Sequence, residues 1–253
     1  MVGRGYNAPV VLSRHRRGST CAVAGLAVIL LVSGALAAKP SPILPAQIPA
    51  GERTRLQELA DAASVSARAA GEPFVARPDV FEFLLDHPEF ATHVTRALKL
   101  ARYRIWRGPE GGLWLDDGWG VVGQFSVVYS AAGTRVAYAH GQYQSGLLPS
   151  IRGQAVVVIE YGLSPTADQR SLISAAVTGF VKLDSRIMAL AGMLAGSVAT
   201  AKAEKEAKRL VKLFAKASRA IEDNPAHVHE AVRLRPDVPP AELEEFRRLL
   251  GLR

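Results

Sequence analysis

Alternating apolar and polar positions fill the middle of the chain and predict an antiparallel sheet. From residue 102 onward the hydrophobic period changes from helical to two, and turn residues such as Gly108-Pro109 and Asp117-Gly118 recur about every ten residues. Connections this short join only antiparallel neighbours, so we expect a meander. The predicted strands span residues 102–107, 112–116, 121–130, 134–144, 151–161 and 171–184.

Helical periodicity precedes this sheet. A short strand at 73–77 leads into two helices, and Pro88 both ends the first helix and suits the first turn of the second. Asp79 and Glu82 have the spacing of a capping box, so we expect Asp79 to begin the first helix. The apolar stripe of that helix consists of Val80, Phe81, Leu84 and Leu85.

Three more helices are expected outside this core. Residues 52–70 have an alanine-rich apolar face followed by Gly71, a typical helix stop. A long helix runs from Ser185 to about Asp223, and Pro239-Pro240 precedes a short last helix. We therefore predict an α+β chain with a long C-terminal helix, an extra N-terminal helix and a C-terminal helical extension.

The first 37 residues have the three parts of a secretory signal peptide. Arg14, Arg16 and Arg17 form a basic region without acidic residues, and residues 21–38 carry no charge. The apolar run ends in Ala35-Leu36-Ala37, where small residues fit the signal peptidase. We expect export to the periplasm or beyond, with cleavage near Ala37. The alternative is an uncleaved N-terminal anchor, because 18 uncharged residues lie at the lower limit for a membrane span.

Much of the positive charge belongs to this leader. The whole chain has 31 Lys and Arg against 23 Asp and Glu, a net charge of +8, and loss of the four leader arginines leaves 27 against 23, or +4. No cluster of basic residues alternates with aromatics, so we predict no nucleic-acid partner. The mature chain also lacks cysteine, which is compatible with an oxidising compartment.

Composition changes mark the domain boundaries. Four prolines occur within residues 39–49, a stretch expected to be an extended linker. The predicted units are a signal peptide at 1–37, a linker at 38–51, an accessory helix at 52–71, a main domain at 72–224 and an extension at 225–253.

Familiar catalytic and metal-binding signatures are absent from the sequence. It contains one cysteine and no GxGxxG, GxxxxGK[ST], HExxH or GxSxG motif, so we assign no catalytic residue and no cofactor. Asp116 and Asp117 lie in a D-D-G turn and are expected to hold the turn. His227 and His229 could meet at one metal from a strand, but no third ligand lies nearby, so we predict no metal site.

The order of strand, two helices, six antiparallel strands and long helix resembles the helix-grip fold of the START and polyketide-cyclase-like (SRPBCC) superfamily. The segment Phe74-Val75-Ala76-Arg77 followed by 79–89 is similar in its pattern of residue classes. The resemblance covers residues 72 to about 224. It implies a curved sheet of about seven strands around the long helix, with a cavity for a lipid, sterol, polyketide or other apolar molecule. It supplies no shared catalytic triad.

Small residues on one strand face indicate where such a cavity would lie. Small side chains leave room for a ligand, although they also allow a helix to approach closely. The expected lining is Ala137, Ala139, Tyr143, Ala155, Val157 and Val177, with Met188 or Leu194 of the long helix as the roof.

Two main functions remain open from the sequence. The first is a non-catalytic carrier or sensor of a lipid or other apolar small molecule in the cell envelope, where peripheral membrane contact is compatible with export. The second is a cyclase- or hydrolase-type enzyme with Tyr129, Tyr138, Tyr143 and His140 as proton-handling candidates. A structural envelope protein with a filled core is a third alternative.

Overall fold

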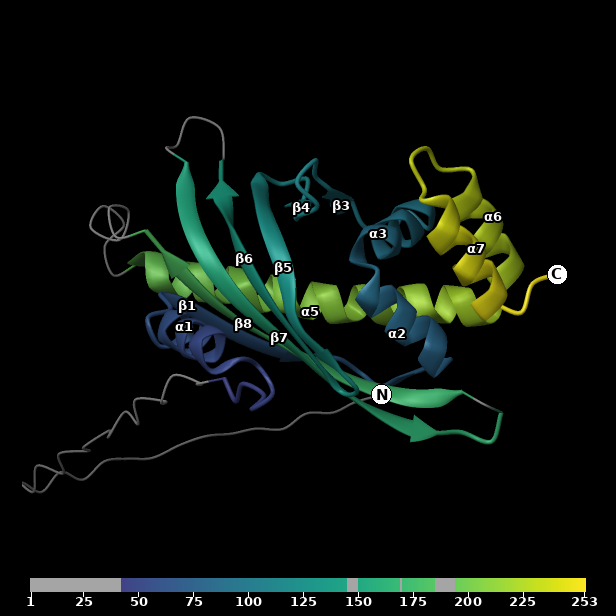
Figure 1. Ribbon diagram of the computed structural model, residues 1–253, viewed down its shortest axis with the longest axis horizontal. Coiled ribbons are helices and arrows are strands. Elements are labelled where there is room, and N and C mark those ends of the chain that lie inside the picture. Colours follow the sequence, from purple (N-terminus) through teal and green to yellow (C-terminus); the bar gives the residue numbers. More distant parts are fainter. Residues whose placement is uncertain (1–41, 145–149, 169, 185–193) are drawn as a thin grey trace, which may run out of the picture. The chain divides into compact units, whose positions relative to one another are not determined.

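The computed structural model describes residues 42–144, 150–168, 170–184 and 194–253, with backbone alone at 194–200 and 202. Within these residues the protein is an α+β structure with one eight-stranded antiparallel sheet and six helices (Figure 1). The predicted leader and the first four residues of the predicted linker lie outside the described residues, as does the predicted start of the long helix at 185–193.

The strands and helices follow the predicted order. The strands are β1 Val65–Ala70, β2 Phe74–Ala76, β3 Arg104–Arg107, β4 Leu113–Asp116, β5 Val121–Ala131, β6 Thr134–Tyr143, β7 Ile151–Pro165 and β8 Ser171–Leu183. The helices are α1 Ala50–Asp61, α2 Pro78–Asp86, α3 Pro88–Ala97, α5 Leu194–Asp223, α6 Pro225–Arg233 and α7 Pro240–Leu249.

The last strand of the meander pairs with the first two strands of the domain. Strands β3 to β8 pair in sequence order, and the last of them, β8, also pairs with β1 and β2 along its other side. The sheet order is therefore β1-β8-β7-β6-β5-β4-β3, with β2 continuing the β1 edge. The first and last strands of the sequence thus lie next to each other.

The predicted helix at 52–71 is too long. Helix α1 ends at Asp61, and residues 65–70 form strand β1, which raises the strand number from about seven to eight. Val65, Ala67 and Ala69 are buried while Arg68 is exposed, so the segment has the period of two of an edge strand. Alanine fits helical and strand periods equally well, and pairing with β8 decides between them.

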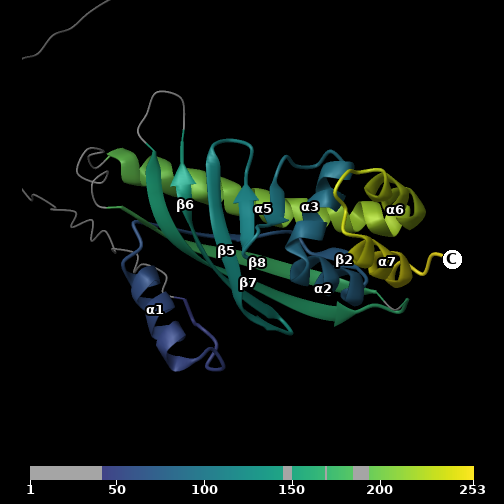
Figure 2. The same cartoon turned by 45° about the horizontal axis from the view of Figure 1, so that its top comes forward.

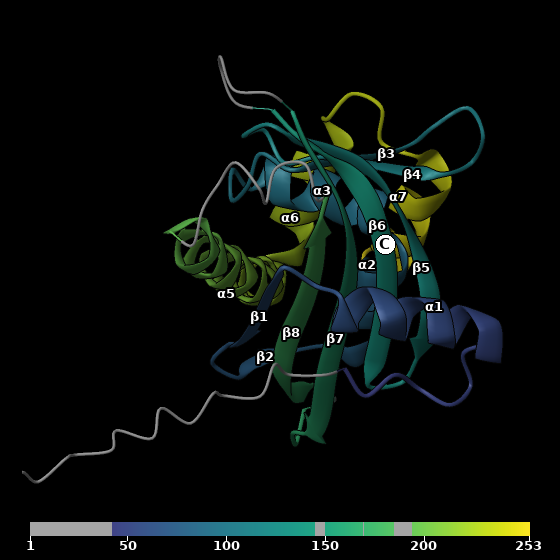
Figure 3. The same ribbon diagram turned by 90° about the vertical axis from the view of Figure 1, so that its left-hand side faces the viewer.

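Helices pack on both faces of the sheet. We call the face beneath α1 the outer face, where Leu56 and Leu59 of α1 pack with Val136, Val156 and Phe180. We call the opposite face the inner face, where Phe214 of α5 packs with residues of β7 and β8. Helix α5 packs chiefly against β1, β2 and β8. Figure 3 shows α1 and α5 on opposite sides of the strands.

The C-terminal extension joins the main domain. Helices α2, α3, α6 and α7 pack around the end of α5 (Figure 2). Their shared core is built from buried Phe83, Phe90, Val94, Val232 and Phe246. Residues 225–253 therefore complete a second hydrophobic core of the same unit.

The predicted start of the first helix is wrong. Helix α2 begins at Pro78 with Arg77 as the N-cap, so Asp79 lies inside the first turn. Proline suits that first position because its missing N–H is not needed there. His227 and His229 lie on helix α6, where side chains two positions apart point in different directions, so they cannot share a metal as a strand pair would.

Candidate functional site

The predicted lining residues of the strands share the inner face. Strand register places Phe125, Ala139, Ala155 and Val181 in one row across β5 to β8, with Val127, Ala137, Val157 and Gly179 in the next. Val177 and Tyr143 have the same strand parity and lie on this face as well. Met188 lies outside the described residues, and Leu194 is described by its backbone alone.

This inner face is only partly covered. Ala137, Ala139, Ala155 and Val157 are half-buried, and Val127 is 40% exposed although it is a strand residue facing the α5 side. Val177, close to the edge on which α5 packs, is buried. The central strands therefore present an accessible surface of small and apolar side chains next to α5.

Helix α5 contacts both edges of the sheet. At the β1 edge the Val211 side chain occupies the space that a side chain on Gly71 would need. At the other edge the Arg209 guanidinium lies 3.8 Å from the ring centroid of Trp119, which follows β4. The Tyr103 hydroxyl, just before β3, donates to Glu206 at 3.0 Å. Helix α5 thus reaches from the β1 edge of the sheet to the segment before β3 and the turn after β4.

The contact at Tyr103 is a partly desolvated polar contact. Burial, together with the neighbouring Glu206 carboxylate, raises the pKa of the Tyr103 hydroxyl to about 12. A phenol with this pKa stays protonated at neutral pH and keeps donating its hydrogen bond. The β3 edge therefore stays joined to α5 over the physiological range.

A row of three glycines gives the sheet its bend. Gly123, Gly141 and Gly153 are register partners on β5, β6 and β7, on the inner face. A Cβ atom on Gly141 would lie 2.6 Å from the Val122 carbonyl oxygen and 2.7 Å from the Gly123 Cα. Such an approach leaves no room for any side chain, so glycine allows these strands to bend and lie close together at this row.

Three of the four proposed proton-handling groups lie on the other face. Tyr138 stacks beneath Arg55 of α1, with the guanidinium carbon 4.1 Å from the ring centroid, and the Tyr129 hydroxyl is 3.5 Å from Gln47 Oε1. His140 shares this outer face with Tyr138. Tyr129, Tyr138 and His140 therefore cannot act on a molecule bound at the inner face, which retains only Tyr143 of the original candidates.

A cavity of about 460 Å³ opens on the outer face. Its walls include Trp114 of β4 and polar side chains of β5, β6 and β7, and the three bend glycines contribute to its floor. The polar lining side chains are Gln124, His140, Gln142, Arg152, Gln154 and Asp184. Alternation along the strands predicts which side chains share this face, whereas the hollow depends on how the strands are placed in the folded sheet.

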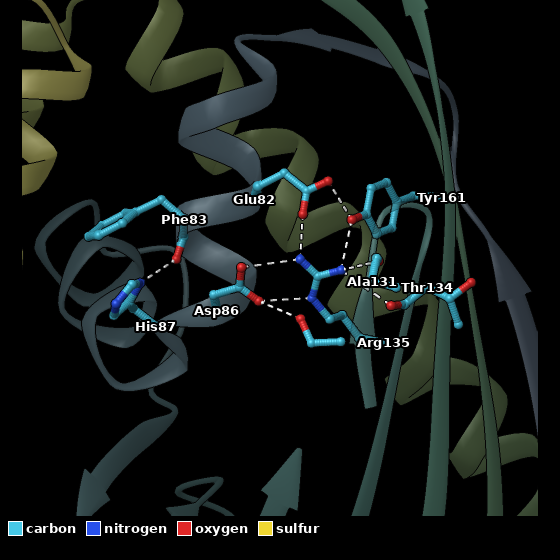
Figure 4. Close-up of polar contacts among 9 residues, drawn as sticks. Glu82, Phe83, Asp86, His87, Ala131, Thr134, Arg135 and Tyr161 are labelled. Atoms are coloured by element: carbon cyan, nitrogen blue, oxygen red, sulfur yellow. Dashed lines mark hydrogen bonds and ion pairs between the residues drawn. The ribbon is translucent and has the colours of Figure 1, made fainter. Parts of the chain in front are cut away.

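A buried arginine joins helix α2 to the sheet (Figure 4). The Arg135 guanidinium of β6, with its side chain 6% exposed, pairs with Glu82 and lies 2.9 Å from Asp86 Oδ1. It also donates to the Tyr161 hydroxyl at 2.9 Å, and that hydroxyl donates to Glu82 at 2.5 Å. We call Glu82, Asp86, Arg135 and Tyr161 the α2 clasp.

The α2 clasp was missed because its residues lie in three separated elements. Burial and the hydrogen bond to Glu82 raise the pKa of Tyr161 to about 12, so the phenol remains a donor. Every polar group of the α2 clasp has a protein partner, which makes it a structural network rather than a reaction centre. The sequence signal for the α2 clasp is the i, i+4 pair of acids Glu82 and Asp86, but the spacing of Glu82 from Asp79 also fits a capping box.

A second hollow, of about 520 Å³, lies between the start of α2 and the end of α5. Its charged side chains already have partners, since Arg77 binds Glu222, Arg170 binds Asp168 and Asp79 accepts from the Val80 amide. We therefore assign no ligand to it.

The D-D-G turn has the predicted structural role. Asp116 Oδ1 accepts from the Gly118 amide at 2.8 Å, and Asp117 Oδ1 accepts from the amides of Trp119 and Val121 at 2.7 and 2.9 Å. Both carboxylates hold the backbone between β4 and β5. Among the described residues, no group of three or more His, Cys, Asp or Glu side chains is placed to hold a metal ion.

Comparison with known proteins assigns no family. No family model matches the chain, and no curated protein matches it. Two solved structures resemble it weakly. A hypothetical protein of Helicobacter pylori shares 10% identity over 61% of this chain and 87% of its own, with a TM-score of 0.36. A conserved protein of Geobacillus kaustophilus shares 15% identity over 63% of this chain and 93% of its own, with a TM-score of 0.35.

Among the described residues, no helix is both long enough and apolar enough to cross a bilayer.

Proposed function

We propose that this chain is an exported helix-grip protein that carries or senses a lipid or other apolar small molecule. The supporting observation is the accessible, small-residue inner face of β5 to β7, next to a helix that contacts both sheet edges. Surfaces of this kind on a folded protein are normally covered, and the space between sheet and helix suits an apolar ligand.

The arrangement of elements supports the helix-grip assignment. The first edge strands pair with the last strand, a meander fills the sheet, and a long C-terminal helix lies on the inner face. This is the order on which the resemblance to the START and polyketide-cyclase-like superfamily rests. The glycine row at Gly123, Gly141 and Gly153 adds the curvature that such a fold needs.

A carrier or sensor fits the inner face better than an enzyme. Acid–base catalysis needs polar groups that converge on the bound molecule. Tyr129, Tyr138 and His140 lie on the outer face, and Arg135 is saturated by the α2 clasp. The remaining inner-face residues of the central strands are mainly alanine, valine and glycine, which can bind by burial alone.

Filling the inner face is expected to displace the ligand. The change is Ala139→Leu together with Ala155→Leu, register neighbours on β6 and β7. If the space is open, the double variant should lose co-purifying lipid and keep its melting temperature, because the added side chains occupy ligand volume. Native mass spectrometry and lipid extraction of protein from its own host provide the measurement, with thermal unfolding in parallel.

The matched control is Ala70→Leu, an exposed alanine of β1 on the outer face. It should change neither lipid content nor stability. A double variant that loses about 1–3 kcal/mol through overpacking, from a parent that carries no lipid, would contradict the proposal and indicate a filled structural core.

Export is the second part of the proposal. It rests on the basic, apolar and small-residue regions of residues 1–37. We expect the mature protein to begin at or near Ala38, in the periplasm or outside the cell. N-terminal sequencing of protein from its own host measures this directly, and recovery of an intact chain from Met1 in the cytosol would contradict it.

A further inference from the structure

We propose that the outer-face cavity is a carbohydrate-binding site, separate from the apolar inner face. Three independent features of the cavity support this inference: its free polar groups, their arrangement on the strands and its fixed aromatic wall. The ligand class that they indicate is an oligosaccharide of pyranose rings.

The polar side chains of the cavity have no protein partners. Within the described part of the chain, Gln124, Gln142, Gln154 and Arg152 form no side-chain hydrogen bond or ion pair, and His140 has only a ring contact with Tyr138. Each glutamine amide offers both donors and acceptors. Sugar hydroxyls also donate and accept, so three amides in one hollow match a polyhydroxylated ligand better than an anion or a hydrocarbon.

Strand register orders these groups into two rows. Gln124, His140 and Gln154 are consecutive partners across β5, β6 and β7, and Gln142 and Arg152 form the neighbouring pair. Adjacent strands lie about 4.8 Å apart, so the first row offers a polar group at about that interval. A rigid sheet holds these groups at fixed spacing, which lowers the ordering cost of binding.

Trp114 provides an aromatic wall at the end of the first row, where it is the register partner of Gln124. Its indole stacks with Trp106 at 6.3 Å between centroids and 15° between planes. The Trp114 ring also fills the space beside Gly108, since a Cβ there would lie 2.7 Å from Nε1. A fixed indole beside free amides can pack against the C–H face of a sugar ring while the amides bind its hydroxyls.

The floor of the cavity depends on the glycine row. Gly123, Gly141 and Gly153 leave backbone atoms accessible between the polar side chains. The lining contains one arginine, Arg152, and one aspartate, Asp184, whose charges cancel. A lining without net charge favours a neutral ligand over a strongly charged one.

The test uses the full mature chain with three probes, chitotetraose, cellotetraose and maltotetraose, by isothermal titration calorimetry. We expect at least one of them to bind with a Kd of about 1 mM or tighter. Trp114→Ala and the double change Gln142→Ala with Gln154→Ala should each weaken binding about tenfold or more. Trp114→Phe, which keeps an aromatic face, should lose less affinity than Trp114→Ala.

Two controls separate this site from folding and from the inner face. Gln57→Ala removes a glutamine from α1, outside the cavity lining, and should leave affinity unchanged. Ala139→Leu with Ala155→Leu should also leave saccharide affinity unchanged, so failure of either proposal can be recognised separately. Circular dichroism checks that each variant is folded. The proposal is overturned if none of the three probes binds, or if binding persists in both cavity variants.

Discussion

Phe246→Ala is expected to lower the free energy of unfolding by about 3–5 kcal/mol. The side chain is fully buried in α7, where its ring stacks with Phe83 at 6.2 Å and meets Phe90 edge-on at 5.2 Å. Removing it leaves a cavity between α2, α3 and α7 that rigid aromatic neighbours cannot fill. Urea unfolding monitored by circular dichroism measures the loss.

Leu234→Ala is the matched control on the same extension. Leu234 is 70% exposed after α6, so its truncation should change the unfolding free energy by no more than about 0.5 kcal/mol. If Phe246→Ala and Leu234→Ala unfold alike, residues 225–253 are an appendage rather than part of the domain core. Such a result would contradict the packing of α7 described above.

The central strands could be predicted from the sequence because two independent signals agree there. A hydrophobic period of two and frequent turn residues both locate β5, β6 and β8, and the structure differs from the predicted bounds by one residue at most. The position of these strands therefore depends on the residues of each strand and its adjacent turns. The D-D-G turn between β4 and β5 was predictable for the same reason, since aspartate holds its own backbone.

Strand β1 could not be distinguished locally from a helix. Ala67 and Ala70 fit the helical spacing that continues from α1, whereas Ala67 and Ala69 fit the strand. Only the free edge of β8, about 110 residues further on, makes the extended form favourable. Interactions this distant in sequence are invisible to a pattern of neighbouring residues.

The same limit applies to the candidate sites. The shared inner face of Ala137, Ala139 and Ala155 followed from strand alternation, which is a local property. The outer-face cavity did not, because it depends on the bend at three glycines that belong to three strands. The α2 clasp was also hidden, since Glu82 has a plausible local role as a capping residue and a different role in the folded chain.

Arg135→Met is expected to destabilise the protein by about 2–4 kcal/mol. Methionine keeps much of the length of the side chain but cannot pair with Glu82, Asp86 and Tyr161. Because Arg135 is buried while Asp86 is 43% exposed, the stranded carboxylates regain part of their hydration, and the expected loss is smaller than for a fully enclosed pair. Urea unfolding at neutral pH gives the value.

The control for charge removal is Arg68→Met, which breaks the pair between Arg68 and Glu160 on the exposed outer face. An exposed pair contributes about 0–1 kcal/mol, so this variant should remain near the parent. The unfolding free energy of Arg135→Lys should lie between those of Arg135→Met and the parent. The lysine ammonium restores the positive charge but lacks the planar guanidinium that binds two carboxylates and a phenol together. Equal stability of Arg135→Met and Arg68→Met would contradict the α2 clasp, and α2 would then be held to the sheet by apolar packing of Phe81 and Leu85.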